Sequence, residues 1–308
     1  WPANPVPVWT WTSCGVPTVQ RDHAPAVPGF RWPGPHRTRC RPDVLHVPGV
    51  ARDTFTGWKL AHRNADFTLN VDKVLEAIAE VKPSMVLLTS PNNPTGTPLP
   101  MEDIERILAA CETAEVVGAG EGVHPILVID EAYVEFRKPG TPSAVSLIKD
   151  HPNLAVSRTM SKAFAFAGAR VGYLAASKGI IDCVRIVRMP YHLSAVTQAA
   201  ALAAFEHTDE QLSRVEHLRE TREATAAWLK EQTYKDQPLE VAESGSNFLL
   251  FGGHFDKREA IFDELLKRGV LIRVVGPDGW LRVCMGTDEE METFRNALVE
   301  VLRIVEAA

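Results

Sequence analysis

Between residues 71 and 188 the sequence alternates short apolar segments with amphipathic ones, and this alternation restricts the possible folds more than any other feature. Runs such as Met85–Thr89 and Ile126–Ile129 are apolar almost throughout, which is typical of strands buried on both faces. Residues 71–82 instead carry apolar side chains at three- and four-residue spacing, which predicts a helix with one buried face. Together they predict an α/β fold with a mostly parallel sheet covered by helices on both faces.

The same criteria predict the remaining elements, and the pattern changes after residue 206. They predict helices over 101–114, 179–188, 208–232 and 256–268 and from Asp288 onward, and strands over 154–156, 171–175, 247–251, 270–273 and 280–285. We therefore expect a large domain over residues 51–206 and a smaller C-terminal α+β domain, with its linking helix, over residues 207–308.

The first fifty residues have a different composition from the rest. They contain ten of the 22 prolines and four of the seven tryptophans, but no Lys, Glu, Ile, Met or Tyr. Proline lacks the backbone donor that sheets need and interrupts helices. We expect residues 1–50 to be an anomalous Pro-, Trp- and Arg-rich segment. It is either a disordered arm or the product of a GC-rich gene read in the wrong frame.

Charge, hydropathy and cysteine content exclude several classes of partner. Thirty-three basic and 39 acidic side chains leave a net charge of −6, which argues against binding nucleic acid through a basic face. No apolar run approaches the ~18 residues of a membrane span, and no secretory signal is visible. Five scattered cysteines and ten histidines show no disulfide or metal-ligand spacing. We expect a cytoplasmic protein without a metal.

Four polar segments lie at or just beyond the ends of predicted strands. They are Ser90–Gly96, Asp130–Tyr133, Ser157–Phe164 and Gly168–Gly172. Each has an ordinary structural explanation when taken alone, such as a turn, a helix cap or a surface charge. Ligands of open α/β sheets collect at the carboxyl ends of the strands, so the four segments in this order favour a binding site.

In sequence and in order, these segments resemble those of the pyridoxal-phosphate (PLP) aminotransferases of fold type I. The resemblance extends from about Ala51 to Val305 and includes Arg188–Ala201. It implies PLP as cofactor and makes residues 51–206 the PLP-binding domain. The family's glycine-rich phosphate turn, stacking aromatic ring and partner-subunit tyrosine precede the stretch matching Ala51 and are not recognisable here. We therefore expect the chain as written to fold poorly or to have little activity.

The resemblance assigns the cofactor contacts to seven side chains. They are Asn93, Asp130, Tyr133, Thr159, Ser161, Lys162 and Arg170. The catalytic residue is Lys162, whose amine binds the cofactor aldehyde and must lose a proton to do so. A carboxylate at Asp130 would keep the ring nitrogen protonated. Asn93 and Tyr133 would donate hydrogen bonds to the phenolic oxygen, and the remaining three would bind the phosphate.

Three residues of the C-terminal part are implied to contact substrate. Arg282 matches the family arginine that binds the substrate carboxylate through a bidentate fork. Arg273 matches an arginine that helps to bind a substrate phosphate, and Asn247 matches a position near the substrate channel.

Within the family, the motifs are most similar to members that transfer an amino group between histidinol phosphate and 2-oxoglutarate in histidine biosynthesis. The expected partners are therefore a small amino donor and a 2-oxo acid, in a homodimer. Three alternatives stay open: an aromatic amino-acid aminotransferase, a PLP lyase similar to threonine-phosphate decarboxylase, and an inactive PLP-binding fragment.

Overall fold

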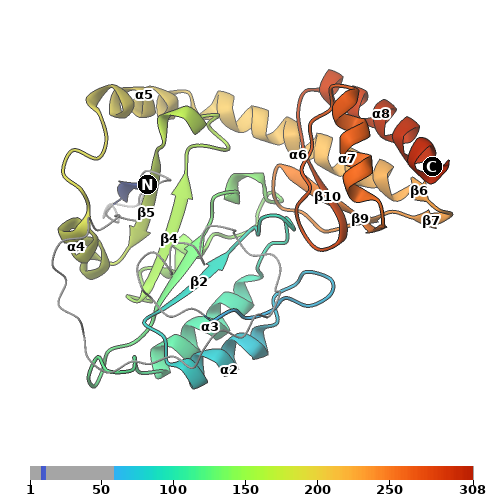
Figure 1. The fold of residues 1–308 in the computed structure, drawn as a ribbon. Helices are drawn as coiled ribbons and strands as arrows, with labels where there is room; N and C mark the ends of the chain where they lie inside the picture. The colour runs from blue at the N-terminus through green and yellow to red at the C-terminus, as the bar shows by residue number, and fades with distance from the viewer. Residues whose placement is uncertain (1–7, 12–58, 308) are drawn as a thin grey trace, which may run out of the picture.

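The computed structural model describes residues 8–11 and 59–307, and its larger sheet has five strands (Figure 1). Their order across the sheet is β1 (Val8–Trp11), β5 (Gly172–Ala176), β4 (Leu154–Thr159), β3 (Ile126–Asp130) and β2 (Met85–Thr89). Strands β2, β3 and β4 run parallel, so their carboxyl ends lie at one edge of the sheet.

Strand β5 runs antiparallel to β4, and β1 runs antiparallel to β5. Only residues 160–171 separate β4 from β5, and their one helical turn is η3 (Ala167–Ala169). A parallel pair needs a crossover that is usually a full helix, so this short connection returns the chain in the opposite direction. The α/β class is confirmed, and the parallel part of the sheet consists of β2, β3 and β4.

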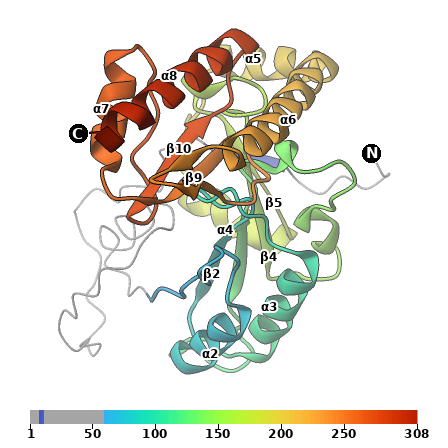
Figure 2. The same cartoon turned by 90° about the vertical axis from the view of Figure 1, so that its right-hand side faces the viewer.

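Helices cover both faces of this sheet (Figures 1 and 2). Side chains of Leu127 and Ile129 point to the face that packs against α2 (Val71–Val81) and α3 (Met101–Thr113). The intervening Ile126 and Val128 face the other side, where α4 (Lys178–Val187) packs. This alternation follows from the two-residue repeat of a strand and explains why the predicted strands are apolar throughout.

Helix α2 shows how the local sequence sets its own boundaries. Val71, Val74 and Ile78 form its buried stripe, as the spacing predicts. The Asn70 side chain caps the helix by accepting a hydrogen bond from the backbone of Lys73, at 3.1 Å.

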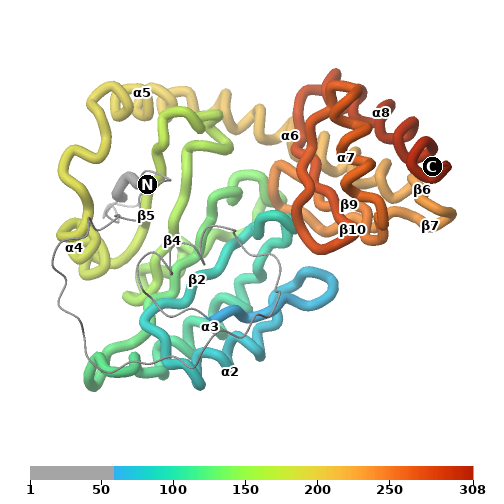
Figure 3. The backbone as a smooth tube through the Cα atoms, in the orientation of Figure 1, coloured from blue at the N-terminus to red at the C-terminus, as the bar shows by residue number. Residues whose placement is uncertain are grey.

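The C-terminal lobe is built around a second sheet. Its elements are α6 (Thr208–Lys230), β6 (Thr233–Tyr234), β7 (Gln237–Pro238), β8 (Glu240–Val241), β9 (Phe248–Phe255), α7 (Arg258–Lys267), β10 (Gly279–Cys284) and α8 (Asp288–Ala307). Helix α5 (Ala195–Glu206) precedes them, and its buried residue Ala201 belongs to an apolar cluster with Tyr133 and Phe164. The sheet has the order β10-β9-β8, and helices α6, α7 and α8 share one apolar core with it. Figure 3 follows the chain from the larger sheet through α5 and α6 into this lobe. The division of the chain into domains at residue 206 stays a prediction.

One predicted strand of this lobe is wrong. Residues 270–273 form a single bridge, between Arg273 and Arg282, instead of a strand. The backbone N–H of Val270 is used to cap α7, where it donates to Leu265 O at 3.0 Å, and Leu271 is 66% exposed. Residues 270–273 therefore begin with the C-terminal cap of α7 and pair with β10 at one residue pair only.

Strand β1 is the only part of the anomalous segment that falls within the described residues. Its backbone pairs with β5 from Val8 to Trp11, which differs from the disordered arm expected there. The other expectations for residues 1–50 lie outside the described residues. In the described part of the chain, no helix has both the length and the apolar character that crossing a bilayer would require.

Candidate active site

The predicted polar segments meet at the edge where β2, β3 and β4 end. Asp130 is the last residue of β3, and Thr159 is the last residue of β4. The turn Ser90–Gly96 follows β2, contains cis peptide bonds before Pro91 and Pro94, and is closed by a hydrogen bond from Gly96 N to Asn92 O at 2.7 Å. The parallel register of these three strands is what brings the segments together.

The Asp130 carboxylate is held by neutral donors. It accepts a hydrogen bond from Ala132 N at 3.0 Å and another from the Ser157 side chain. Burial raises the pKa of this carboxyl above its ordinary value, and these hydrogen bonds oppose the rise. A buried carboxylate in such surroundings is stabilised by a cationic partner, so the position fits a protonated ring nitrogen.

Lys162 and Tyr133 lie against each other. The Lys162 Nζ is 5.3 Å from the centroid of the Tyr133 ring. The Lys162 residue is exposed, but the desolvation of its amine by neighbouring groups lowers its pKa. The positive charges of Arg282 and Arg170 lower the pKa further, against an opposing contribution from Cys284. Burial raises the pKa of Tyr133 to about 12, so its hydroxyl keeps its proton at neutral pH. The pair thus combines an amine that loses its proton readily with a phenol that can donate a hydrogen bond.

Arg282 joins the C-terminal lobe to the turn after β2. Its Nη1 donates a hydrogen bond to Asn93 Oδ1, and its guanidinium lies 4.7 Å from the centroid of the Phe248 ring. The Phe248 ring in turn meets Tyr133 edge-on, with 5.2 Å between the centroids. Since the Asn93 oxygen is occupied by Arg282, its amide nitrogen is left to donate elsewhere. Two residues predicted for separate roles, Asn93 and Arg282, are therefore in direct contact.

The three residues predicted to bind phosphate lie around the connection between β4 and β5. Thr159 Oγ1 accepts a hydrogen bond from Ser161 N at 3.1 Å, and Arg170 Nη1 donates to Ala167 O at 2.8 Å. The Ser161 hydroxyl oxygen is buried and has no hydrogen-bond partner among the described residues. A buried hydroxyl without a partner fits an anionic acceptor, which supports a phosphate at this position.

Arg273 and Asn247 are connected to the other predicted site residues through backbone contacts. Arg273 pairs with Arg282 through two backbone hydrogen bonds of 2.9 Å, which puts both side chains on one face of the ladder, and Arg273 is exposed. Asn247 is directly followed by Phe248, and its carbonyl accepts a hydrogen bond from Met285 N at 2.8 Å. The roles of both residues in binding substrate stay predictions.

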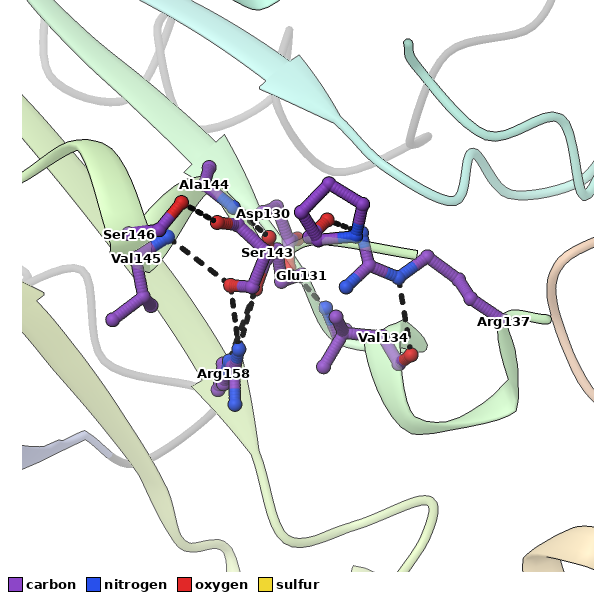
Figure 4. A network of polar contacts seen from close by, with 11 residues as sticks. Asp130, Glu131, Val134, Arg137, Ser143, Ala144, Val145, Ser146 and Arg158 are labelled. Carbon is purple, nitrogen blue, oxygen red and sulfur yellow. Dashed lines mark hydrogen bonds and ion pairs between the residues drawn. The ribbon is translucent and has the colours of Figure 1, made fainter. Parts of the chain in front are cut away.

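A buried ion pair behind the site was not predicted (Figure 4). Glu131 is 1% exposed, and its Oε2 accepts two hydrogen bonds from Arg158, at 3.0 and 2.8 Å. Ser143 Oγ and Ala144 N also donate to this carboxylate, at 2.7 and 2.9 Å. The network ties the end of β3 to β4 and therefore fixes the backbone that carries Asp130. The sequence feature that could have indicated this network is Glu131 itself, a second acidic residue directly after Asp130 at the end of β3.

Comparison of the sequence with known protein families identifies the family of this chain. The family described as aminotransferase class I and II matches residues 47–298. The chain belongs to this family. The match begins close to Ala51, where the resemblance in the sequence begins, so the predicted aminotransferase family and its α/β fold are confirmed.

This class I and II aminotransferase has close relatives among characterised sequences and solved structures. It is 95% identical over 277 residues to the histidinol-phosphate aminotransferase of Bifidobacterium longum, covering 89% of this chain and 72% of that protein. The corresponding protein of Bifidobacterium adolescentis is 77% identical, with 90% and 71% covered. The histidinol-phosphate aminotransferase of Sinorhizobium meliloti, solved with PLP, superposes with a TM-score of 0.73 at 25% identity, covering 85% of this chain and 69% of that one.

Proposed function

We propose that this aminotransferase uses PLP to transfer an amino group between histidinol phosphate and 2-oxoglutarate in histidine biosynthesis. The observation that carries the proposal is geometric: the Lys162 amine lies 5.3 Å from the centroid of the Tyr133 ring, and Tyr133 itself lies within electrostatic range of Asp130 and Arg282. When bound, PLP supplies an aldehyde for the amine and a ring that accepts electrons from the substrate.

Each side chain has a distinct part in this chemistry. With PLP bound, Lys162 Nζ would be the amine that condenses with the aldehyde, with release of water. Once displaced by the substrate, the same amine would be the base that accepts the proton from the substrate carbon that carries nitrogen. Asp130 keeps the ring nitrogen protonated, and Tyr133 and Asn93 donate hydrogen bonds to the phenolic oxygen. The phosphate is bound by the remaining members of the predicted set, Thr159, Ser161 and Arg170.

The choice of substrate is supported by the relatives. The two Bifidobacterium proteins at 95% and 77% identity both carry the histidinol-phosphate name. A threonine-phosphate decarboxylase from Porphyromonas gingivalis is similar in fold alone, at 22% identity. In our proposal Arg282 binds the carboxylate of glutamate or 2-oxoglutarate, and Arg273 binds the phosphate of histidinol phosphate.

We also propose that the active form is a homodimer. Large apolar side chains are exposed at the end of α4 and along α5, and Ala201 is the one residue of α5 that is buried. These exposed side chains are Ile186, Val187, Met189, Val196, Leu202 and Phe205. Large exposed apolar side chains on successive segments are often part of a subunit interface. A cytoplasmic location completes the proposal and is supported by free cysteines at Cys111, Cys183 and Cys284.

The substrate assay tests this proposal directly. The PLP-loaded protein is incubated with 2-oxoglutarate and, in separate reactions, with histidinol phosphate, phenylalanine or threonine phosphate, and the products are identified. We expect glutamate and imidazole acetol phosphate from the first reaction at the highest rate. Preferential turnover of phenylalanine, or release of carbon dioxide from threonine phosphate, would favour one of the alternative functions instead.

Replacing Lys162 by Ala tests the catalytic assignment. We expect turnover to fall by at least about 10³-fold, because both the covalent attachment and the proton transfer are lost. PLP should still bind non-covalently, and the near-visible absorbance of the protein should change with the loss of the attachment. The matched control is Lys149→Ala, since Lys149 has a side chain that is 77% exposed. Turnover of Lys162→Ala near that of the control would contradict the assignment.

A further inference from the structure

Arg222 is a buried cation in the middle of α6 that contacts two separate parts of the chain. The residue is 2% exposed. Its Nη1 donates one hydrogen bond to Phe136 O at 2.8 Å and another to Ser246 O at 2.7 Å. On its other side, Arg222 Nη2 donates to Glu223 Oε1 at 2.7 Å, and that carboxylate is 60% exposed. One guanidinium nitrogen therefore holds two backbone carbonyls that lie 110 positions apart in the sequence.

The two carbonyls belong to the backbone on either side of the candidate site. Phe136 ends the short helix η1 (Val134–Phe136), which begins directly after Tyr133. Ser246 lies two residues before Phe248, where β9 begins. The Phe248 ring contacts both Tyr133, at 5.2 Å, and the Arg282 guanidinium, at 4.7 Å between centres. Arg222 thus fixes the backbone behind the cofactor side and behind the substrate side of the site.

Stability alone does not account for this arrangement. A guanidinium taken out of water loses hydration free energy, and hydrogen bonds to neutral carbonyls recover only part of it. Its main carboxylate partner, Glu223, is largely in solvent, where the attraction between the charges is weak. What the guanidinium supplies is geometry, because its planar nitrogens hold both acceptors in fixed directions.

We propose that Arg222 is a positioning residue that sets the distance between Arg282 and the Tyr133–Lys162 pair. This inference rests on the proposed function, in which Arg282 binds the substrate carboxylate. Arg222 acts through the backbone of Ser246 and the ring of Phe248, and it touches neither the substrate nor the cofactor. Loss of its donors leaves two buried carbonyls without partners and allows the two segments to separate.

Substitutions of Arg222 in the full-length, PLP-loaded protein test this role. We expect Arg222→Gln to weaken binding of glutarate, an unreactive dicarboxylate, by about tenfold, the effect of losing one buried hydrogen-bonding group. Arg222→Lys keeps a cation that can donate to both carbonyls and should recover part of the affinity. The matched control is Arg214→Gln, on the same helix but in an exposed pair with Glu210. It should bind glutarate as the parent protein does.

Amide hydrogen exchange supplies a second readout that does not depend on activity or on glutarate. In Arg222→Gln, and more weakly in Arg222→Lys, the amides of residues 134–137 and 246–248 should exchange faster together, with no such change in Arg214→Gln. Unchanged exchange in both segments would overturn the proposal, as would parent-like glutarate affinity accompanied only by a lower melting temperature. If the parent protein itself binds no glutarate, the carboxylate site of the proposed function fails, and the exchange data still decide whether Arg222 couples the segments. If Arg222→Gln does not fold, the Lys variant alone decides, by the same criteria.

Discussion

Glu135 is a partly buried acid that the proposed chemistry does not use. Its Oε2 atom is buried and has no hydrogen-bond partner within the described part of the chain. Burial raises the pKa of Glu135 to about 7, although the nearby guanidinium groups of Arg158 and Arg137 oppose the rise. Near neutral pH this side chain is therefore divided between its charged and uncharged forms.

Glu135→Gln should stabilise the protein at high pH only. The folded-state pKa of about 7 lies above the ordinary value of 4.5, so folding disfavours the charged form. Below pH 4.5 the carboxyl is protonated in both states, and no cost arises. As the pH rises from 4.5 to about 7 the free energy of unfolding of the parent falls, by ~3 kcal/mol in total, because one pKa unit corresponds to about 1.4 kcal/mol, and above pH 7 it levels off. Glutamine avoids this loss.

Urea unfolding at pH 5 and pH 8 measures the effect. The difference between Glu135→Gln and the parent should be small at pH 5 and largest at pH 8. Glu105→Gln is the control, since Glu105 is exposed on α3. An equal gain at both pH values would show that the change acts through packing and not through the charge.

For individual residues, motifs made of neighbouring positions could be predicted from the sequence, whereas contacts between distant positions could not. Lys162 and Asp130 stand in short segments at strand ends, where the neighbouring residues reveal the context. Arg222 lies in a helix rich in charged residues, a pattern typical of solvent exposure, and its acceptors are 86 and 24 residues away. Its burial follows from the packing of two lobes, which the sequence of one helix does not contain.

Among the elements, the turn after β2 and the segment before β9 approach each other most closely at Gly96. The Gly96 backbone has a φ of +83°, and its carbonyl accepts a hydrogen bond from Gly245 N at 2.8 Å. A Cβ added at Gly96 would lie 2.3 Å from Ser244 Oγ and 2.7 Å from Ser244 Cβ. Glycine is required here both for the backbone conformation and for the contact between the lobes.

Gly96→Ala should therefore destabilise the protein more than Gly140→Ala. Both glycines have positive φ, but a Cβ at Gly140 would meet nothing within 4 Å. The Gly140 variant reports the backbone cost alone, about 1 kcal/mol. We expect Gly96→Ala to cost a further ~1–3 kcal/mol, typical of overpacking, measured as the difference in free energy of unfolding. Equal losses for the two variants would mean that Ser244 moves aside without cost.

The element boundaries show where sequence patterns suffice. Helices α2, α3 and α8 follow from apolar periodicity, because each buries one stripe. The direction of β5 was not predictable from its own residues, since an apolar run has the same composition in parallel and antiparallel pairs. It depends on the length of the connection from β4.

For the whole molecule, the exposed apolar side chains of α5 are the feature that a monomer leaves unexplained. Leu202→Glu should dissociate the proposed homodimer, because a charge buried without a partner costs about 3–5 kcal/mol. Leu202 is 66% exposed, and Leu266 on α7, 47% exposed, provides the control as Leu266→Glu. Light scattering after size-exclusion chromatography should give a monomer for the first variant and a dimer for the second. A parent protein that is monomeric would refute the interface.

The positive charge of Arg282 beside Lys162 has a consequence for the order of chemical events. Arg282 is one of the charges that lower the pKa of Lys162. A substrate carboxylate that pairs with Arg282 compensates this charge, so the Lys162 amine that the substrate has displaced is more basic than the free amine of an empty site. By linkage, the amine accepts a proton more readily once a substrate carboxylate is seated. The bound substrate thereby makes Lys162 a stronger base. In an empty site the lysine is less basic, so a larger fraction of it is unprotonated and able to act as a nucleophile.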